Sequence, residues 1–253
     1  MIAFRTTTHR RAAEVATAFL KEQPEVDAVL LVGSAARRAD ANDLDLSAIV
    51  SASDQGPQVE RKFAEFAARS PELLALNDLG RFVALDFHTT DGDFSPRPRG
   101  WTSGPDGFEL EIGNEVAYSV TVWQRDARVT KLRRQWLPFY GDPLREERLT
   151  SARMYAVNDL DHVQLMLDRD EPFHAFHRLY IGFQEFLQAL FIARRTYPIA
   201  YDKWVREQVE GILGLGGLYA ELPEIIGIPG LDGERITQST ERLRILLDEW
   251  TTE

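Results

Sequence analysis

The chain has 253 residues, of which 44% are hydrophobic and 27% charged, and its formal net charge is −11. These values are typical of a globular protein with one large or two ordinary domains. The negative charge disfavours a nucleic-acid partner, because phosphate contacts require Lys and Arg. The absence of cysteine excludes disulfides, thiol nucleophiles and zinc–cysteine sites. The sequence shows neither a bilayer-length apolar run nor a signal peptide, so we expect a cytoplasmic protein without a membrane partner.

The first predicted elements are a helix over 9–20 and a strand over 26–32. The helix follows from apolar residues at helical spacing, and the strand from a run that is apolar except for Asp27. Such a continuous run suits a strand covered on both faces. Gly33 then permits a turn with close approach of the backbone, and Ser34 adds a hydroxyl and an N–H group.

Two carboxylates, Asp43 and Asp45, open the next predicted strand, which ends at residue 50. Because side chains alternate along a strand, both carboxylates are expected on one face. Two like charges side by side are unfavourable unless a cation or a proton lies between them. Hard carboxylate oxygens suit Mg²⁺, so the pair is a predicted divalent-metal site.

A third predicted strand, 81–88, follows a second amphipathic helix over 58–69 and carries Asp86 within an otherwise apolar pattern. An isolated buried carboxylate is costly, so we expect Asp86 to be paired with a cation or to lie at the exposed end of the sheet. His88 shares its face, with either a structural or an assisting role. Glu111 is the rival third carboxylate, and Asp91 and Asp93, in a loop beyond the strand, rank lower.

The stretch from 90 to 107 is a long predicted loop whose Arg97, Arg99 and Trp101 are placed to overhang a ligand. Two further strands, 108–112 and 116–123, are predicted around a Gly-Asn hairpin signal. The N-terminal part is therefore predicted as a mixed sheet of about five strands with helices packed on it.

Proline and glycine at 138–143 mark the predicted domain boundary, which divides the chain into domains 1–138 and 139–253. Beyond it the strand pattern disappears, and helices are predicted over 144–167, from Pro172 onward, over 202–213 and over 232–250. A four- or five-helix bundle is the simplest packing of these elements. The fold class is thus predicted as α+β, with a C-terminal all-α bundle.

A Gly-Ser turn followed by Asp-x-Asp at the start of a strand resembles the signature of the nucleotidyltransferase superfamily, to which polymerase β and the antibiotic nucleotidyltransferases belong. The resemblance implies that Gly33 and Ser34 hold the triphosphate of a nucleotide and that Asp43 and Asp45 carry Mg²⁺. Members add a third acidic residue from a later strand, and Asp86 matches it in type and context. Asp86 is then a metal ligand, the general base that takes the proton of the acceptor hydroxyl, or both.

The helical domains of antibiotic nucleotidyltransferases have basic residues that face the nucleotide. By this likeness Lys203, in a basic linker within the predicted bundle, is expected to contact the triphosphate, although a solvated basic turn explains it equally well.

The implied activity is transfer of an adenylyl group from ATP to a small-molecule acceptor, with aminoglycosides leading and lincosamides close behind. The partners are thus a nucleoside triphosphate and this acceptor, for a monomer or a dimer. Two alternatives stay open: adenylylation of a protein, as in toxin–antitoxin nucleotidyltransferases, and a catalytically inert nucleotide-binding protein. The inert alternative rests on the eight-residue connection between Ser34 and Asp43, which is shorter than is usual in the family.

Overall fold

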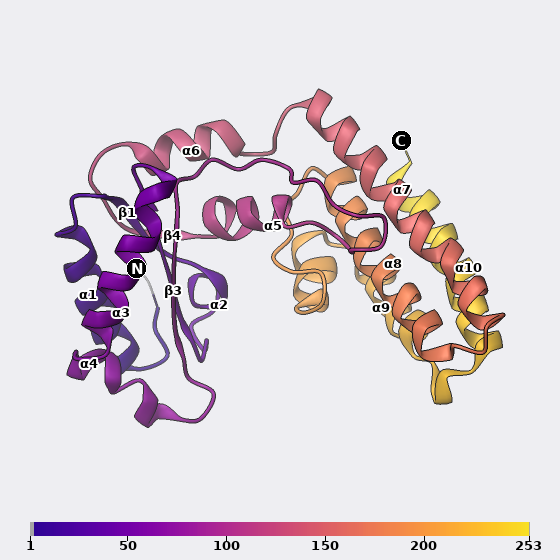
Figure 1. Ribbon diagram of the computed structural model, residues 1–253, viewed down its shortest axis with the longest axis horizontal. Coiled ribbons are helices and arrows are strands. Elements are labelled where there is room, and N and C mark those ends of the chain that lie inside the picture. The colour runs from indigo at the N-terminus through magenta and orange to yellow at the C-terminus, as the bar shows by residue number, and fades with distance from the viewer. Residues whose placement is uncertain (1–2, 253) are drawn as a thin grey trace. The chain divides into compact units, whose positions relative to one another are not determined.

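The computed structural model describes residues 3–252 and divides the chain into two compact units (Figure 1). One unit comprises Met1–Ser95 and Glu111–Leu137, and the other comprises Pro96–Leu110 and Pro138–Glu253. We assigned 96–110 to the first domain from the sequence, whereas the structure groups this segment with the helical unit. Within residues 3–252, the helices are all too short or too polar to cross a membrane.

The first unit is built around a mixed sheet of four strands in the order β3-β2-β1-β4. Strand β1 is antiparallel to both β2 and β4, and β2 is parallel to β3. The predicted α+β class with a mixed sheet flanked by helices is confirmed, with four strands instead of about five. The elements of this unit are α1 (Thr7–Lys21), β1 (Val26–Leu31), α2 (Gly33–Arg37), β2 (Leu44–Val50), η1 (Ser53–Gln55), α3 (Gly56–Ala67), α4 (Pro71–Leu74), η2 (Asn77–Leu79), β3 (Leu85–Thr90), η3 (Gly113–Ala117), β4 (Val120–Gln124) and α6 (Arg128–Trp136).

Helices α1, α3 and α4 pack on one face of this sheet (Figure 1). The apolar side chains of β2, including Leu44 and Leu46, point into this core, where they meet Leu20 of α1 and Phe63 of α3. Because side chains alternate along a strand, the residues between them, Asp45 among these, lie on the opposite face. The core therefore fixes which face of the sheet is left for polar side chains.

The predicted hairpin around Gly113-Asn114 is wrong, because the chain there is helical. Residues Phe108–Ile112 form α5, and a π-helical turn, η3, continues it. Phe108, Ile112 and Val116 are all buried, and their spacing of four residues is that of one helical face. The alternation that we took for a strand also contains this spacing, and tertiary burial selected the helix. Only β4 remains of the predicted second strand.

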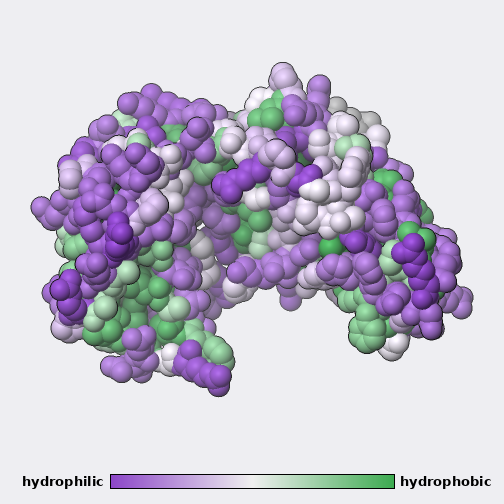
Figure 2. Space-filling view, in the orientation of Figure 1, coloured by the Kyte–Doolittle hydropathy of each residue, from purple (hydrophilic) through white to green (hydrophobic). Residues whose placement is uncertain are grey.

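The second unit is helical, as predicted for the C-terminal region. Its long helices α7, α8 and α10 pack against one another around a common apolar core (Figure 1). The elements are α7 (Asp142–Leu167), α8 (Pro172–Ala193), η4 (Glu207–Ile212), α9 (Gly216–Ile226), η5 (Pro229–Leu231) and α10 (Gly233–Thr251). Most of the visible surface of both units is hydrophilic (Figure 2).

A buried polar network ties the segment 96–110 to the helices of its own unit. The guanidinium of Arg148 on α7 donates to Asp106 at 2.7 and 2.8 Å and to Glu109 at 2.7 and 2.8 Å. Gln188 of α8 and Tyr140 also donate to Glu109, which is fully buried. A buried carboxylate is tolerated only when it is paired and hydrogen-bonded, and this network supplies both conditions.

Candidate functional site

The turn after β1 places Gly33 directly against the Asp45 carboxylate. Gly33 has φ +57°, a left-handed conformation that glycine adopts readily. A Cβ atom built on Gly33 would lie 2.2 Å from Asp45 Oδ2, so any side chain would displace this carboxylate. The backbone is also joined here, since the Val32 N–H donates to the Asp45 carbonyl at 3.0 Å. The glycine of the motif and its second aspartate therefore form one local structure.

Ser34 lies in the first turn of α2, a helix of only five residues. Its carbonyl accepts a hydrogen bond from the Arg38 N–H at 2.9 Å, and Arg37 donates a side-chain hydrogen bond to the Gly33 carbonyl at 2.8 Å. These contacts hold the turn in shape and bring the Ser34 backbone close to the Gly33–Asp45 contact.

Asp43 lies one residue before β2 and is half-buried. Its Oδ1 atom accepts a hydrogen bond from the Ala84 N–H at 2.9 Å, and the Leu44 N–H donates to the Ala84 carbonyl at the same distance. These bonds fasten the start of β2 to the residue that precedes β3. Asp43 thus has a structural role in the sheet in addition to the ligand role that the sequence predicts.

Asp86 is the direct neighbour of Asp45 in the sheet. The two residues are Cα partners in the parallel pairing of β2 with β3, so their side chains lie on the same face. Strand β3 is at the edge of the sheet, and Asp86 is exposed, which agrees with the expectation of a solvated sheet end. The sequence-predicted third carboxylate therefore lies beside the Asp-x-Asp strand.

Glu111 occupies a helix instead of a strand, as the last residue but one of α5. Within residues 3–252, we find no group of three or more His, Asp or Glu side chains that could hold a metal ion by themselves. Mg²⁺ commonly binds through one or two carboxylates together with substrate phosphates and water, and does not require an all-protein cage. The carboxylates of Asp43, Asp45 and Asp86 are a donor set of this chemistry.

Glu115 is a residue of this face that sequence reasoning missed. It is buried in the η3 turn, and its Oε1 atom lies 2.7 Å from His88 Nε2. His88 is the Cα partner of Ser47, two residues along β3 from Asp86, and so shares its face. The expectation of a strand at 116–123 hid Glu115, because a hairpin would have placed it in a turn.

The surroundings of His88 favour its protonated form. The hydrogen bond with Glu115 raises the pKa of His88 above its ordinary value, which outweighs the opposing effect of burial. The negative charges of Glu115, Glu60 and Asp45 act in the same direction. The polar face of the sheet thus combines two carboxylates in register with a histidine whose pKa is raised by a third, buried carboxylate.

Lys203 belongs to the helical unit, where its side chain is exposed and its carbonyl accepts a hydrogen bond from Gln208 at 3.0 Å. Its expected contact with the triphosphate stays a prediction. Arg99 and Trp101, which we expected near a ligand, are engaged within the helical unit. The Arg99 guanidinium lies 3.7 Å from the centre of the Tyr155 ring, and Trp101 packs on the same ring.

Comparison of the chain with models of protein families and with curated proteins finds no match.

Proposed function

We propose that this protein transfers an adenylyl group from Mg²⁺-ATP to a hydroxyl group of a small-molecule acceptor and releases pyrophosphate. The observation that carries the proposal is the pairing of Asp45 with Asp86 on adjacent parallel strands, beside a turn in which Gly33 has a left-handed backbone and a Cβ atom would collide with Asp45. This arrangement agrees with the resemblance of the Gly-Ser and Asp-x-Asp motifs to nucleotidyltransferases.

In the proposed reaction the acceptor oxygen attacks the α-phosphorus of ATP, and the bond from that phosphorus to the bridging oxygen breaks. Asp43 and Asp45 would hold Mg²⁺, whose charge stabilises the leaving pyrophosphate. Asp86, in register with Asp45, is the side chain to take the proton of the acceptor hydroxyl or to act as a further metal ligand. Gly33 and Ser34 would hold the phosphates through the N–H groups and the hydroxyl of the turn.

A cationic acceptor such as an aminoglycoside is the class that we favour. The net charge is −11, and the polar face carries Asp45, Asp86 and the buried Glu115. Negative potential of this kind attracts a polyamine and repels a nucleic acid. Adenylylation of a protein is the alternative within enzymes, and an inert nucleotide-binding protein is the alternative outside them.

The first test measures binding of Mg²⁺-ATP by calorimetry. We expect binding in the wild type and its loss in Asp43→Asn and Asp45→Asn, with Asp78→Asn, an exposed aspartate of the same unit, as the matched control. Because Asp43 also fastens β2 to Ala84, the thermal unfolding of each variant must be measured alongside. Equal, weak binding by the wild type and both site variants contradicts the proposal.

The second test identifies the acceptor. Aminoglycosides, lincosamides and proteins are incubated with ATP labelled in the α-phosphate, and pyrophosphate release and product mass are followed. Asp86→Asn should abolish turnover and Glu111→Gln should not, and the reverse result would move the third carboxylate to Glu111. A labelled protein product favours the protein-modifying alternative, and tight ATP binding without any product favours the inert one.

A further inference from the structure

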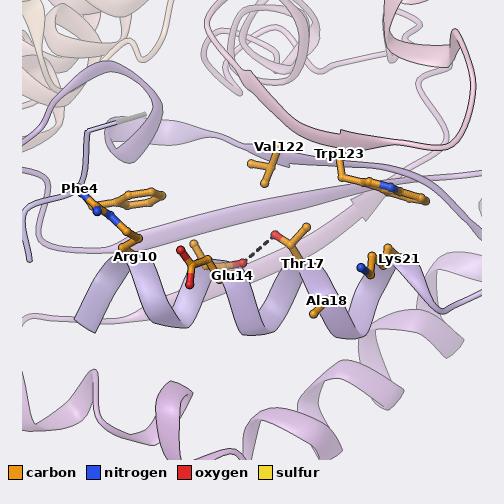
Figure 3. Close-up of a pocket in the computed structure, with 9 residues that line it drawn as sticks. Phe4, Arg10, Glu14, Thr17, Ala18, Lys21, Val122 and Trp123 are labelled. Atoms are coloured by element: carbon orange, nitrogen blue, oxygen red, sulfur yellow. Dashed lines mark hydrogen bonds between the residues drawn. The ribbon is translucent and has the colours of Figure 1, made fainter. Parts of the chain in front are cut away.

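A groove of about 490 Å³ lies between α1 and β4 in the first unit (Figure 3). Its volume is within the range of small-molecule sites, and its lining does not include the residues of the proposed nucleotide site. The groove exists because β4 is an edge strand whose side chains are only partly covered. Ala13 and Ala18 also line the groove, and their side chains are too small to fill the space.

The groove is elongated along α1. Arg10, Glu14 and Lys21 project from the helix into its lining, at a spacing that keeps them on one side of α1 (Figure 3). At 1.5 Å of rise per residue, Arg10 and Lys21 are separated by about 16 Å along the axis. Phe4 lies beside Arg10 at one end, and Trp123 lies beside Lys21 at the other (Figure 3).

The floor between these ends is apolar. Ala13, Ala18 and Val122 contribute only hydrocarbon, and the Thr17 hydroxyl donates to the Ala13 carbonyl of its own helix at 2.7 Å. Thr17 therefore does not require a polar partner from a ligand. A hydrophobic chain or ring laid along this floor would be removed from water at little polar cost.

The charges of the groove are unequal at its two ends. Among residues 3–252, neither Arg10 nor Lys21 forms an ion pair. Glu14 lies 3.6 Å from Arg11, a residue that does not line the groove. Glu14 is one helical turn from Arg10, whereas it is about 10 Å of helix from Lys21. Lys21 is thus the cation of the lining that lies farther from Glu14, in a chain whose net charge is −11.

A second positive charge strengthens the Lys21 end. The guanidinium of Arg125 lies 5.4 Å from the centre of the Trp123 ring and donates to the Gln23 carbonyl, just beyond the end of α1, at 3.0 Å. A second copy of the chain is a poorer occupant of the groove. Two-fold pairing about its centre would bring Arg10 of one copy against Lys21 of the other.

We propose that this groove binds an elongated amphipathic carboxylate, such as a medium-chain fatty acid, independently of the proposed nucleotidyl transfer. The carboxylate lies against Lys21 beside Trp123, and the hydrocarbon chain runs along Ala18 and Val122 toward Phe4. The ligand class follows from the length of the apolar floor and from the two cations, Lys21 and Arg125, at one end.

The test is calorimetric titration with decanoate and with decanol, supported by NMR of the Trp123 indole N–H. We expect saturable binding of decanoate, perturbation of the Trp123 signal and weaker binding of decanol. Lys21→Gln should weaken decanoate binding about three- to fivefold, as expected for an exposed charge pair, while decanol binding stays the same. Arg11→Gln, with the same charge change outside the groove, should bind both ligands as the wild type does.

Ala18→Phe fills the groove from an exposed helix position and should abolish decanoate binding while thermal unfolding stays close to that of the wild type. The proposal is overturned if decanoate does not bind, if Lys21→Gln and Arg11→Gln weaken its binding equally, or if Ala18→Phe still binds it. A dimer in sedimentation that Ala18→Phe dissociates would also overturn it, because the occupant would then be a second copy.

Discussion

Replacement of Gly33 by alanine tests the contact on which the proposed site is built. The new Cβ would lie 2.2 Å from Asp45 Oδ2 and 2.9 Å from Asp45 Cγ, so the carboxylate must move. A left-handed conformation costs a non-glycine residue about 1–2 kcal/mol, and forced repacking at a filled position costs about 1–3 kcal/mol. We therefore expect Gly33→Ala to lower the free energy of unfolding by about 2–5 kcal/mol.

The chain offers a control for each part of this cost. Gly214 has φ +69° with open space around its missing side chain, so Gly214→Ala carries the backbone strain without a collision. Gly100 has neither a left-handed backbone nor a neighbour within 4 Å, and Gly100→Ala should be almost neutral. The expected order of destabilisation in urea unfolding is Gly33→Ala, then Gly214→Ala, then Gly100→Ala.

A double-mutant cycle isolates the collision with the carboxylate. Asp45→Ala removes Oδ2 and Cγ and leaves only Cβ, which would lie 3.2 Å from the new atom. The double variant should therefore be about 1–3 kcal/mol more stable than the sum of the two single changes predicts. Additive effects, or a cost of Gly33→Ala no greater than that of Gly214→Ala, would refute the close packing of Gly33 against Asp45.

Three further predictions follow from the polar groups of the two units. Glu115→Gln should lower the pKa of His88 in an NMR titration. Because folding raises the pKa of His88, the His88–Glu115 pair stabilises the protein fully below about pH 6.5. This stabilisation is lost as the pH rises through the pKa of His88 in the folded protein. Arg148→Met should lower the free energy of unfolding by about 3–5 kcal/mol, because Glu109 is left buried without its cation. Burial and the charge of Asp159 raise the pKa of Glu185. The folded protein therefore keeps this proton at a pH where the unfolded chain releases it, and the wild type should lose stability relative to Glu185→Gln as the pH rises above about 4.5.

Each of these predictions has its own control or contrary result. Glu111→Gln should leave the titration of His88 as it is in the wild type. If Glu111→Gln and Glu115→Gln shift the pKa of His88 equally, Glu115 is not the group that raises it. Arg206→Gln breaks an exposed ion pair with Glu210 and should change stability far less than Arg148→Met. For Glu185, parallel pH profiles of wild type and variant would show that the carboxyl titrates normally.

The sequence by itself determined the parts of the site that depend on local pattern. The buried run of β1, the Gly33 turn and the alternation of β2 follow from the type and order of neighbouring residues. Alternation over 81–88 predicted a third strand that carries Asp86, and the resemblance to nucleotidyltransferases implied its place beside the Asp-x-Asp strand, although β3 begins at Leu85 instead of residue 81. Amphipathic spacing likewise predicted the long helices of the second unit.

Tertiary structure decided the features that depend on distant partners. The stretch 108–117 carries both a two-residue and a four-residue apolar spacing, and burial of its four-residue face selected the helix that brings Glu115 to His88. The stretch 96–107 shows no periodic signal. The place of the segment 96–110 in the helical unit is stabilised by Arg148, which lies 39 residues along the chain from Glu109. Contacts between residues so far apart cannot be predicted from the local spacing of apolar residues, because they depend on how the other elements pack.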